Sequence, residues 1–107
     1  MKIIHDFEGK KFFTEIEEKI CEVEYEVTDN NTIEVIRTYV DPDFRGKGIA
    51  AELLTWLSNF ATENGYKVKP VCSYAVMFYK RHNEFQNLIS KKEDLEGFDS
   101  CNISKKR

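Results

Sequence analysis

The residues best placed to do chemistry lie in the run DPDFRGKGIA, residues 41–50. In this run Arg45 and Lys47 alternate with Gly46 and Gly48, and a helix-forming segment follows. Glycine lets the backbone approach a ligand closely because it has no Cβ. The first N–H groups of a helix lack an internal partner, and together with the helix dipole they attract an anion. We therefore predict a phosphate or pyrophosphate site here, in preference to a plain turn before a helix.

Two familiar phosphate-binding loops fit this run poorly. A P-loop needs a glycine, four residues and then Gly-Lys-Ser or Gly-Lys-Thr, and that spacing is missing. In a dinucleotide fold the strand runs almost directly into the first glycine, and an acidic residue ends the next strand. Here residues 41–45 intervene, and the next predicted strand ends in Val71-Cys72-Ser73, without an acid. The ligand is then expected to be a different phosphate-bearing molecule.

Alternating residues before the loop predict antiparallel strands. The segments 11–16, 20–27 and 32–40 each have this pattern, and Asp29-Asn30-Asn31 form a turn between the last two. In the third segment we expect one face of the strand to carry Ile33, Val35, Arg37 and Tyr39. The pattern is typical of a meander with one buried and one solvated face.

The segment after the loop changes to a helical pattern. Apolar residues recur every three or four positions from about residue 47 to 64, and Gly65 is expected to end this helix. Residues 66–72 predict a short strand, in which Pro70 indicates a sheet edge or a bulge. A strand, a helix and a second strand in this order predict a right-handed βαβ unit with parallel strands.

A second helix of about ten residues is predicted within residues 73–85, with Ser73 capping its first turn and Asn83 near its end. We expect residues 1–90 to form a single domain. Residues 91–107 are charged and aperiodic, and they are expected to form a tail.

Composition excludes several classes of protein. The chain of 107 residues is 41% hydrophobic and carries a net charge of −3, which argues against a general nucleic-acid binder. No apolar run approaches the length of a membrane span. Three cysteines without paired spacing indicate reduced thiols, and the positions of cysteine and histidine predict no metal site. We expect a soluble, cytoplasmic protein, a monomer or a weak dimer.

The run VDPDFRGKGIAAELL resembles the acetyl-CoA loop of the GCN5-related N-acetyltransferases. That family has Arg or Gln, two residues, Gly, one residue and then Gly or Ala, which here correspond to Arg45, Gly48 and Ala50. The resemblance covers residues 20–88 and narrows to a small, compact subfamily through GKGIA, PVCSY and YKRH. Such proteins lack the two helices that ordinarily follow the first strand, and residues 16–20 leave no room for them. The resemblance implies an α+β fold whose mixed, twisted sheet is splayed at the CoA site.

The same resemblance implies roles for individual residues. The CoA pyrophosphate would be held by backbone N–H groups of Arg45, Gly46, Lys47, Gly48, Ile49 and Ala50. The backbone of Val40 would pair with the pantetheine amides, and Asp41 and Phe44 would line the turn. Tyr79 would be the general acid for the departing thiolate.

Two further side chains have open alternatives. Cys72 would accept the acetyl group transiently, bind CoA as a disulfide, or simply pack beneath the second helix. His82 would be the base for the acceptor amine, or a surface residue. Tyr74 is expected only to pack.

Two functions follow from the resemblance. The first is an acetyl-CoA-dependent N-acetyltransferase that acts on an amine of a small molecule or a protein. The alternative is an acetyl-CoA or CoA binder with little or no turnover. Tyr79 and Cys72 favour the enzyme, whereas the short N-terminal half favours the binder.

Overall fold

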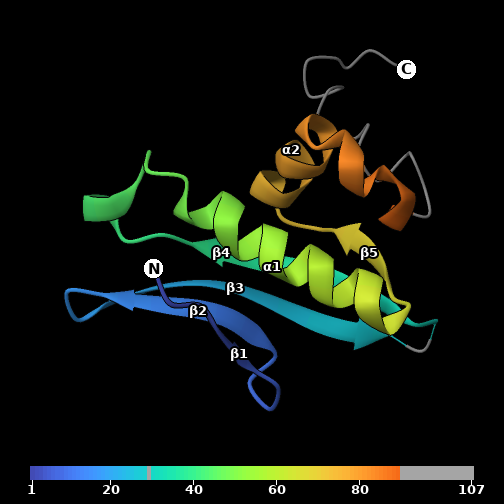
Figure 1. Cartoon of the computed structure of the whole chain (residues 1–107), viewed down its shortest axis with the longest axis horizontal. Helices are drawn as coiled ribbons and strands as arrows, with labels where there is room; N and C mark the ends of the chain where they lie inside the picture. Colours follow the sequence, from blue (N-terminus) through green and yellow to red (C-terminus); the bar gives the residue numbers. More distant parts are fainter. Residues whose placement is uncertain (29, 90–107) are drawn as a thin grey trace.

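A mixed β-sheet with helices on one of its faces makes up the computed structural model, which describes residues 1–28 and 30–89 (Figure 1). The sheet has the strand order β1-β2-β3-β4-β5. Its strands are β1 (Ile4–Asp6), β2 (Lys11–Ile16), β3 (Lys19–Thr28), β4 (Thr32–Tyr39) and β5 (Lys67–Pro70). The first four pair antiparallel and β5 pairs parallel to β4, which confirms the predicted meander and βαβ unit.

The helices follow the glycine loop and the last strand. They are α1 (Ile49–Asn64) and α2 (Ser73–Arg81), with short 3₁₀ helices η1 (Pro42–Phe44) and η2 (Asn83–Leu88). As predicted, α1 ends at Gly65, whose φ of 76° is left-handed. Among the described residues, no helix is both long and apolar enough to cross a membrane.

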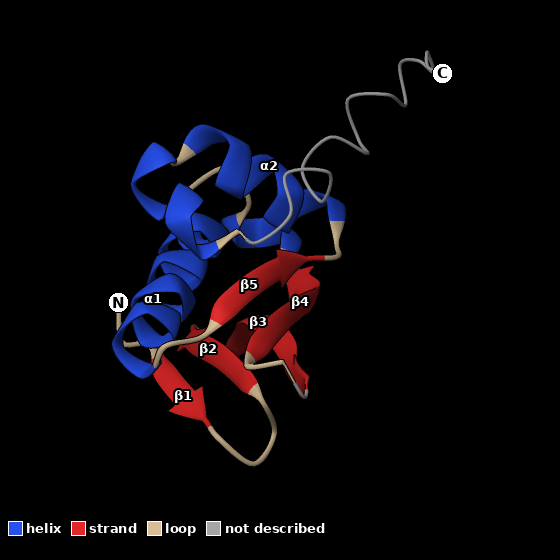
Figure 2. Cartoon of the chain, turned by 90° about the vertical axis from the view of Figure 1, so that its right-hand side faces the viewer, coloured by secondary structure: helices blue, strands red, loops and turns tan. Residues whose placement is uncertain are grey.

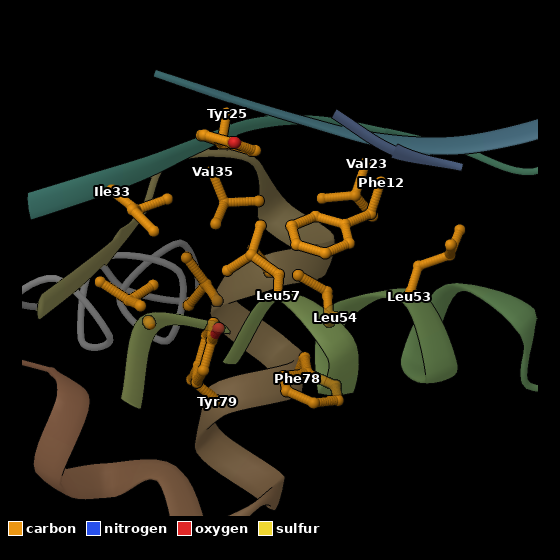
Figure 3. Close-up of a cluster of buried hydrophobic side chains, with 14 of the residues drawn as sticks. Phe12, Val23, Tyr25, Ile33, Val35, Leu53, Leu54, Leu57, Phe78 and Tyr79 are labelled. Atoms are coloured by element: carbon orange, nitrogen blue, oxygen red, sulfur yellow. The ribbon is translucent and has the colours of Figure 1, made fainter. Parts of the chain in front are cut away.

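One hydrophobic core lies between the sheet and the two helices (Figures 1 and 3). The alternating inner residues of the strands supply one side of this core, and the apolar stripes of α1 and α2 supply the other. Its largest fully buried side chains include Phe12, Val23, Ile33, Val35, Leu53, Leu54, Leu57, Val68, Val76 and Tyr79. The predicted helical stripe of α1 therefore packs on the predicted buried face of the meander.

The opposite face of the sheet carries ion pairs instead of helices. On it, Glu22 accepts a bond of 2.6 Å from Arg37 and lies 3.3 Å from the Lys11 ammonium. Burial raises the pKa of the Glu22 carboxyl, but the hydrogen bonds from these two cations outweigh that effect and lower the pKa overall. The predicted wet face of β3 is thus a network of paired charges.

A β-bulge in β4 makes one prediction wrong. Tyr25 pairs with Val35, but Glu24 pairs with Arg37, so Ile36 is an extra residue in β4. One extra residue moves every later side chain to the other face. Arg37 and Tyr39 therefore leave the face of Ile33 and Val35, and Thr38 turns inward opposite Val23.

Several short elements and the two ends of α2 also differ from the prediction. The strand β1 and the helices η1 and η2 are short elements that the periodicity did not indicate. Cys72 and not Ser73 occupies the N-cap of α2, without a side-chain capping bond, and His82 rather than Asn83 ends the helix. The predicted tail, residues 91–107, lies outside the described residues.

Candidate functional site

An open cavity of about 430 Å³ lies where β4, the glycine loop and the start of α2 meet. This volume is in the range of small-molecule sites. Its lining comes from the end of β4, from the loop with the first turn of α1, and from α2, namely Thr38, Tyr39, Val40, Phe44, Arg45, Gly46, Gly48, Ile49, Ala50 and Tyr74. The structure thus brings together all but one of the predicted cofactor-binding residues, the exception being Lys47.

The cavity opens because β4 and β5 separate. Their pairing runs from Thr32 opposite Lys67 to Val35 opposite Pro70. The N–H groups of Val71 and Cys72 then both donate to the carbonyl of Val35, at 2.9 and 3.1 Å. Beyond that point β4 continues to Tyr39 while the other chain turns into α2. The end of β4 is left without a strand on this side, which is the predicted splay.

The glycine loop adopts a conformation that only glycine takes readily. Gly46 and Gly48 have φ values of +81° and +79°, and a Cβ built on either would meet no atom within 4 Å. Gly48 is the N-cap of α1 and offers no side chain to satisfy the helix. The first bond within α1 runs from the N–H of Glu52 to Gly48, so the three preceding N–H groups have no acceptor in the helix. Such donors at an open cavity fit a phosphate.

Arg45 supplies a cation at the cavity and also fixes the chain that enters the loop. Its Nε donates to the carbonyl of Val40 at 3.0 Å, which engages one of the five N–H donors of the guanidinium. That bond uses one of the two lone pairs of the Val40 carbonyl, on the residue whose backbone was expected to pair with the pantetheine amides. Lys47 is exposed and does not line the cavity.

The turn before the loop is braced from the β2–β3 hairpin. Asp41 caps η1 by accepting a bond of 3.0 Å from the N–H of Asp43. The Lys19 ammonium contacts the Asp43 carboxylate and lies 3.9 Å from Asp41. The hydrogen bond to Asp43 raises the pKa of Lys19, and the same bond lowers the pKa of Asp43. The hairpin therefore holds the segment that leads into the glycine loop.

Tyr79 lies away from the cavity. Its side chain is fully buried in the core (Figure 3). Its hydroxyl is 2.6 Å from Ser58 Oγ, which itself donates to the carbonyl of Leu54 at 2.7 Å. Because the Ser58 proton is used in that second bond, the Tyr79 hydroxyl donates to Ser58. Burial raises the pKa of Tyr79 far above its usual value, and the bond to Ser58 only partly opposes this. The geometry makes this hydroxyl a link between α1 and α2.

Cys72 and His82 occupy the two ends of α2. The Cys72 sulfur is 3.3 Å from Thr38 Oγ1, and Thr38 lines the cavity. The Nδ1 of His82 is 2.8 Å from the carbonyl of Phe78, and its ring stacks on the Phe78 ring with centroids 4.0 Å apart. A carbonyl can only accept, so Nδ1 carries a proton. Of the three predicted catalytic residues, Cys72 is therefore the one that contacts the cavity wall.

Sequence reasoning missed Tyr74 and Thr38 as site residues. Tyr74 is 41% exposed and lines the cavity from the first turn of α2, where burial raises the pKa of its hydroxyl and Arg81 lowers it less. The helical period could have indicated Tyr74. Tyr79 lies one turn after Ala75 on the buried side of α2, whereas Tyr74 is not on the stripe that these two residues share. Thr38 could not be found in this way, since the bulge in β4 decides where it points.

Comparisons with known proteins identify the family to which this chain belongs. The family model described as GCN5-related N-acetyl-transferase matches residues 11–88, which is well over half of the chain. The chain belongs to the GCN5-related N-acetyltransferase family. The family resemblance of the glycine loop, and the α+β fold that it implied, are thereby confirmed.

One solved structure that is similar to this chain has the same fold. It is the NMR solution structure of a GCN5-like N-acetyltransferase candidate from Staphylococcus aureus, at 27% identity and a TM-score of 0.69. The similarity covers 82% of this chain and 86% of that one. A search of curated proteins finds no match.

The β2–β3 connection leaves no room for helices between these two strands. Strands β2 and β3 are joined only by Glu17 and Glu18, both with positive φ, and Ile16 pairs directly with Lys19. Two residues with positive φ are typical of the tightest hairpin turn. The predicted lack of helices at this point is therefore confirmed.

Proposed function

We propose that this protein is an acetyl-CoA-dependent N-acetyltransferase that acts on an amine. Family membership supports acetyl transfer in general. The observation that carries the finer proposal is that the free end of β4 and the left-handed glycine loop line one cavity. A strand edge offers amide partners to an extended chain, and the loop offers N–H donors to a phosphate. CoA carries both groups, an amide-bearing arm and a pyrophosphate.

The residues present fit this ligand. The N–H groups at the start of α1 and the cation of Arg45 would bind the pyrophosphate, and Gly46 and Gly48 leave room for it. Backbone groups at the free end of β4, those of Val40 among them, would pair with the pantetheine amides, since the bond from Arg45 uses only one lone pair of the Val40 carbonyl. When bound, acetyl-CoA supplies its acetyl group as a thioester that an amine can attack.

We propose that Tyr74, rather than Tyr79, donates the proton that the leaving sulfur of CoA needs. Tyr74 lines the cavity, and its raised pKa keeps the hydroxyl protonated at neutral pH. Tyr79 donates to Ser58 and does not line the cavity. Cys72 is proposed to lie beside the acetyl-bearing end through its contact with Thr38, where it would accept the acetyl group transiently.

A CoA-binding protein with little turnover is a second candidate, and one observation favours it. The hydroxyl of Tyr79 and the Nδ1 of His82 are both engaged within the protein, at Ser58 and at the Phe78 carbonyl. The predicted acid is thus occupied by a structural bond, and the predicted base, although its Nε2 keeps a lone pair, does not line the cavity. A binder needs only the loop and the strand edge.

The test is to incubate the protein with acetyl-CoA and a panel of amines, and to follow thiol release together with intact mass. For an enzyme we expect amine-dependent thiol release that falls strongly in Tyr74→Phe. Binding by calorimetry without thiol release would support the CoA binder instead. Failure to bind CoA would overturn both functions and the assignment of the loop.

The role of Cys72 is tested in the same experiment. A transient acyl-enzyme predicts a mass increase of one acetyl group in the wild type and none in Cys72→Ala. Cys21 serves as the internal control, because it is fully buried in β3. An unchanged rate of amine acetylation in Cys72→Ala would leave direct transfer as the mechanism.

A further inference from the structure

A second cavity, of about 330 Å³, lies on the other flank of α1, against the β1–β2 edge of the sheet. Figure 2 shows β1 beside α1 at this edge. The cavity is lined by His5, Phe12, Trp56, Asn59, Phe60 and Glu63. It shares no residue with the glycine-loop cavity, so the proposed function leaves it without a role.

Aromatic rings form most of its wall. The His5 ring stacks on Phe12 with centroids 4.0 Å apart and an interplanar angle of 13°, and it meets Phe60 edge-on at 4.6 Å. Trp56 lies one helical turn before Phe60 on α1 and is 47% exposed. Tryptophan is highly buried on average in folded proteins, whereas this indole stays open at the cavity. Phe12 is buried beneath His5, so among these rings the Trp56 indole is the one most accessible to a ligand.

The charge of the lining has one sign. Glu63 is its only carboxylate, and neither lysine nor arginine is among the lining residues. His5 Nε2 is 2.6 Å from the Tyr25 hydroxyl, and burial lowers the pKa of the imidazole more than the Asp6 carboxylate raises it, which disfavours the cationic form of this ring. An anion would meet the Glu63 carboxylate without a compensating cation, whereas a cation would meet the carboxylate and the electron-rich ring faces.

We propose that this aromatic cavity binds an organic ammonium ion with methyl groups on its nitrogen. Methyl groups would contact Trp56 and Phe60, and the positive charge would interact with the open Trp56 indole and with Glu63. A bare metal ion would lack ligands, since the lining offers one carboxylate, one amide and an imidazole that is already hydrogen-bonded. The expected ligand is therefore an organic cation with an apolar surface.

The single tryptophan of the chain makes this site directly observable. Because Trp56 lines the cavity, its fluorescence is titrated with choline chloride, with sodium chloride held at matched ionic strength. The neutral isostere 3,3-dimethylbutan-1-ol has the same shape without the charge. We expect saturable quenching by choline, with the isostere binding roughly 2- to 30-fold more weakly, the span expected from cation–π energies.

Two variants locate the charge effect. Glu63→Gln should weaken choline binding a few-fold and leave the isostere unchanged, because only the cation interacts with the carboxylate. Glu84→Gln is the matched control, since Glu84 is exposed in η2 and does not line the cavity. Circular dichroism of all three proteins checks that folding is unaffected.

Three outcomes would overturn the proposal. Equal affinity for choline and the isostere would mean an apolar pocket without preference for charge. A Trp56 signal that changes on dilution of the protein alone would mean that a second copy of the chain covers the cavity. No change in Trp56 fluorescence at choline concentrations high enough to saturate a weak binding site would mean that no organic cation binds in this cavity.

Discussion

Removal of one hydroxyl, in Tyr79→Phe, separates the two roles open to this side chain. Tyr79 is 0% exposed, and its hydroxyl lies 2.6 Å from Ser58 Oγ. If the hydroxyl serves as a link between helices, the variant should lose stability and keep its affinity for CoA. If it serves as the acid, the variant should keep stability and lose turnover.

The expected loss of stability follows from the hydrogen bonds. Phenylalanine preserves the ring and its packing, so the change is confined to one buried bond. Ser58 still donates to Leu54, and only its acceptor lone pair loses a partner. Loss of one such bond costs about 1–2 kcal/mol. In a domain of about 100 residues this lowers Tm by roughly 4–15 °C.

Thermal and urea unfolding followed by circular dichroism measure the effect. Ser58→Ala should cost a similar amount, and the double variant should cost less than the two single changes together, since both remove the same bond. Tyr74→Phe is the matched control, because that hydroxyl is on a side chain 41% exposed and its loss should change stability little. An unchanged Tm in Tyr79→Phe together with lost thioester turnover would refute this reasoning.

Three more predictions concern the loop, its brace and the outer face of the sheet. Gly48→Val places a β-branched residue at a φ of +79° and a Cβ in open space at the cavity, so CoA affinity measured by calorimetry should fall at least about tenfold. Lys19→Met removes the contact with Asp43 and should weaken CoA binding only a few-fold, an effect that should vanish at high salt. The pKa of Glu22 is lowered in the folded state, so the stability it contributes is present above the unfolded pKa and is lost as pH falls through the folded one. Glu22→Gln should therefore reduce stability at pH 7 and flatten the acid-induced loss in urea titrations, whereas an unchanged pH profile would show that the bond to Arg37 is not formed in solution.

Much of the fold could be predicted because its elements have strong local patterns. Alternation located β2, β3 and β4, and the apolar stripe located α1 between the glycine loop and Gly65. The three-residue strand β1 has no such pattern, because it exists only through pairing with β2. Pairing between distant segments is invisible to a window of neighbouring residues.

The sequence by itself determined the glycine loop, since positive φ at Gly46 and Gly48 and an adjoining helix start are local properties. Only the tertiary structure decided which side chains face the cavity. The bulge at Ile36 turns Thr38 toward it, and the packing of α2 on α1 buries the hydroxyl of Tyr79 while it leaves Tyr74 open. A side chain's direction depends on register and helix rotation, which the whole core fixes together; a residue's type alone does not carry that information.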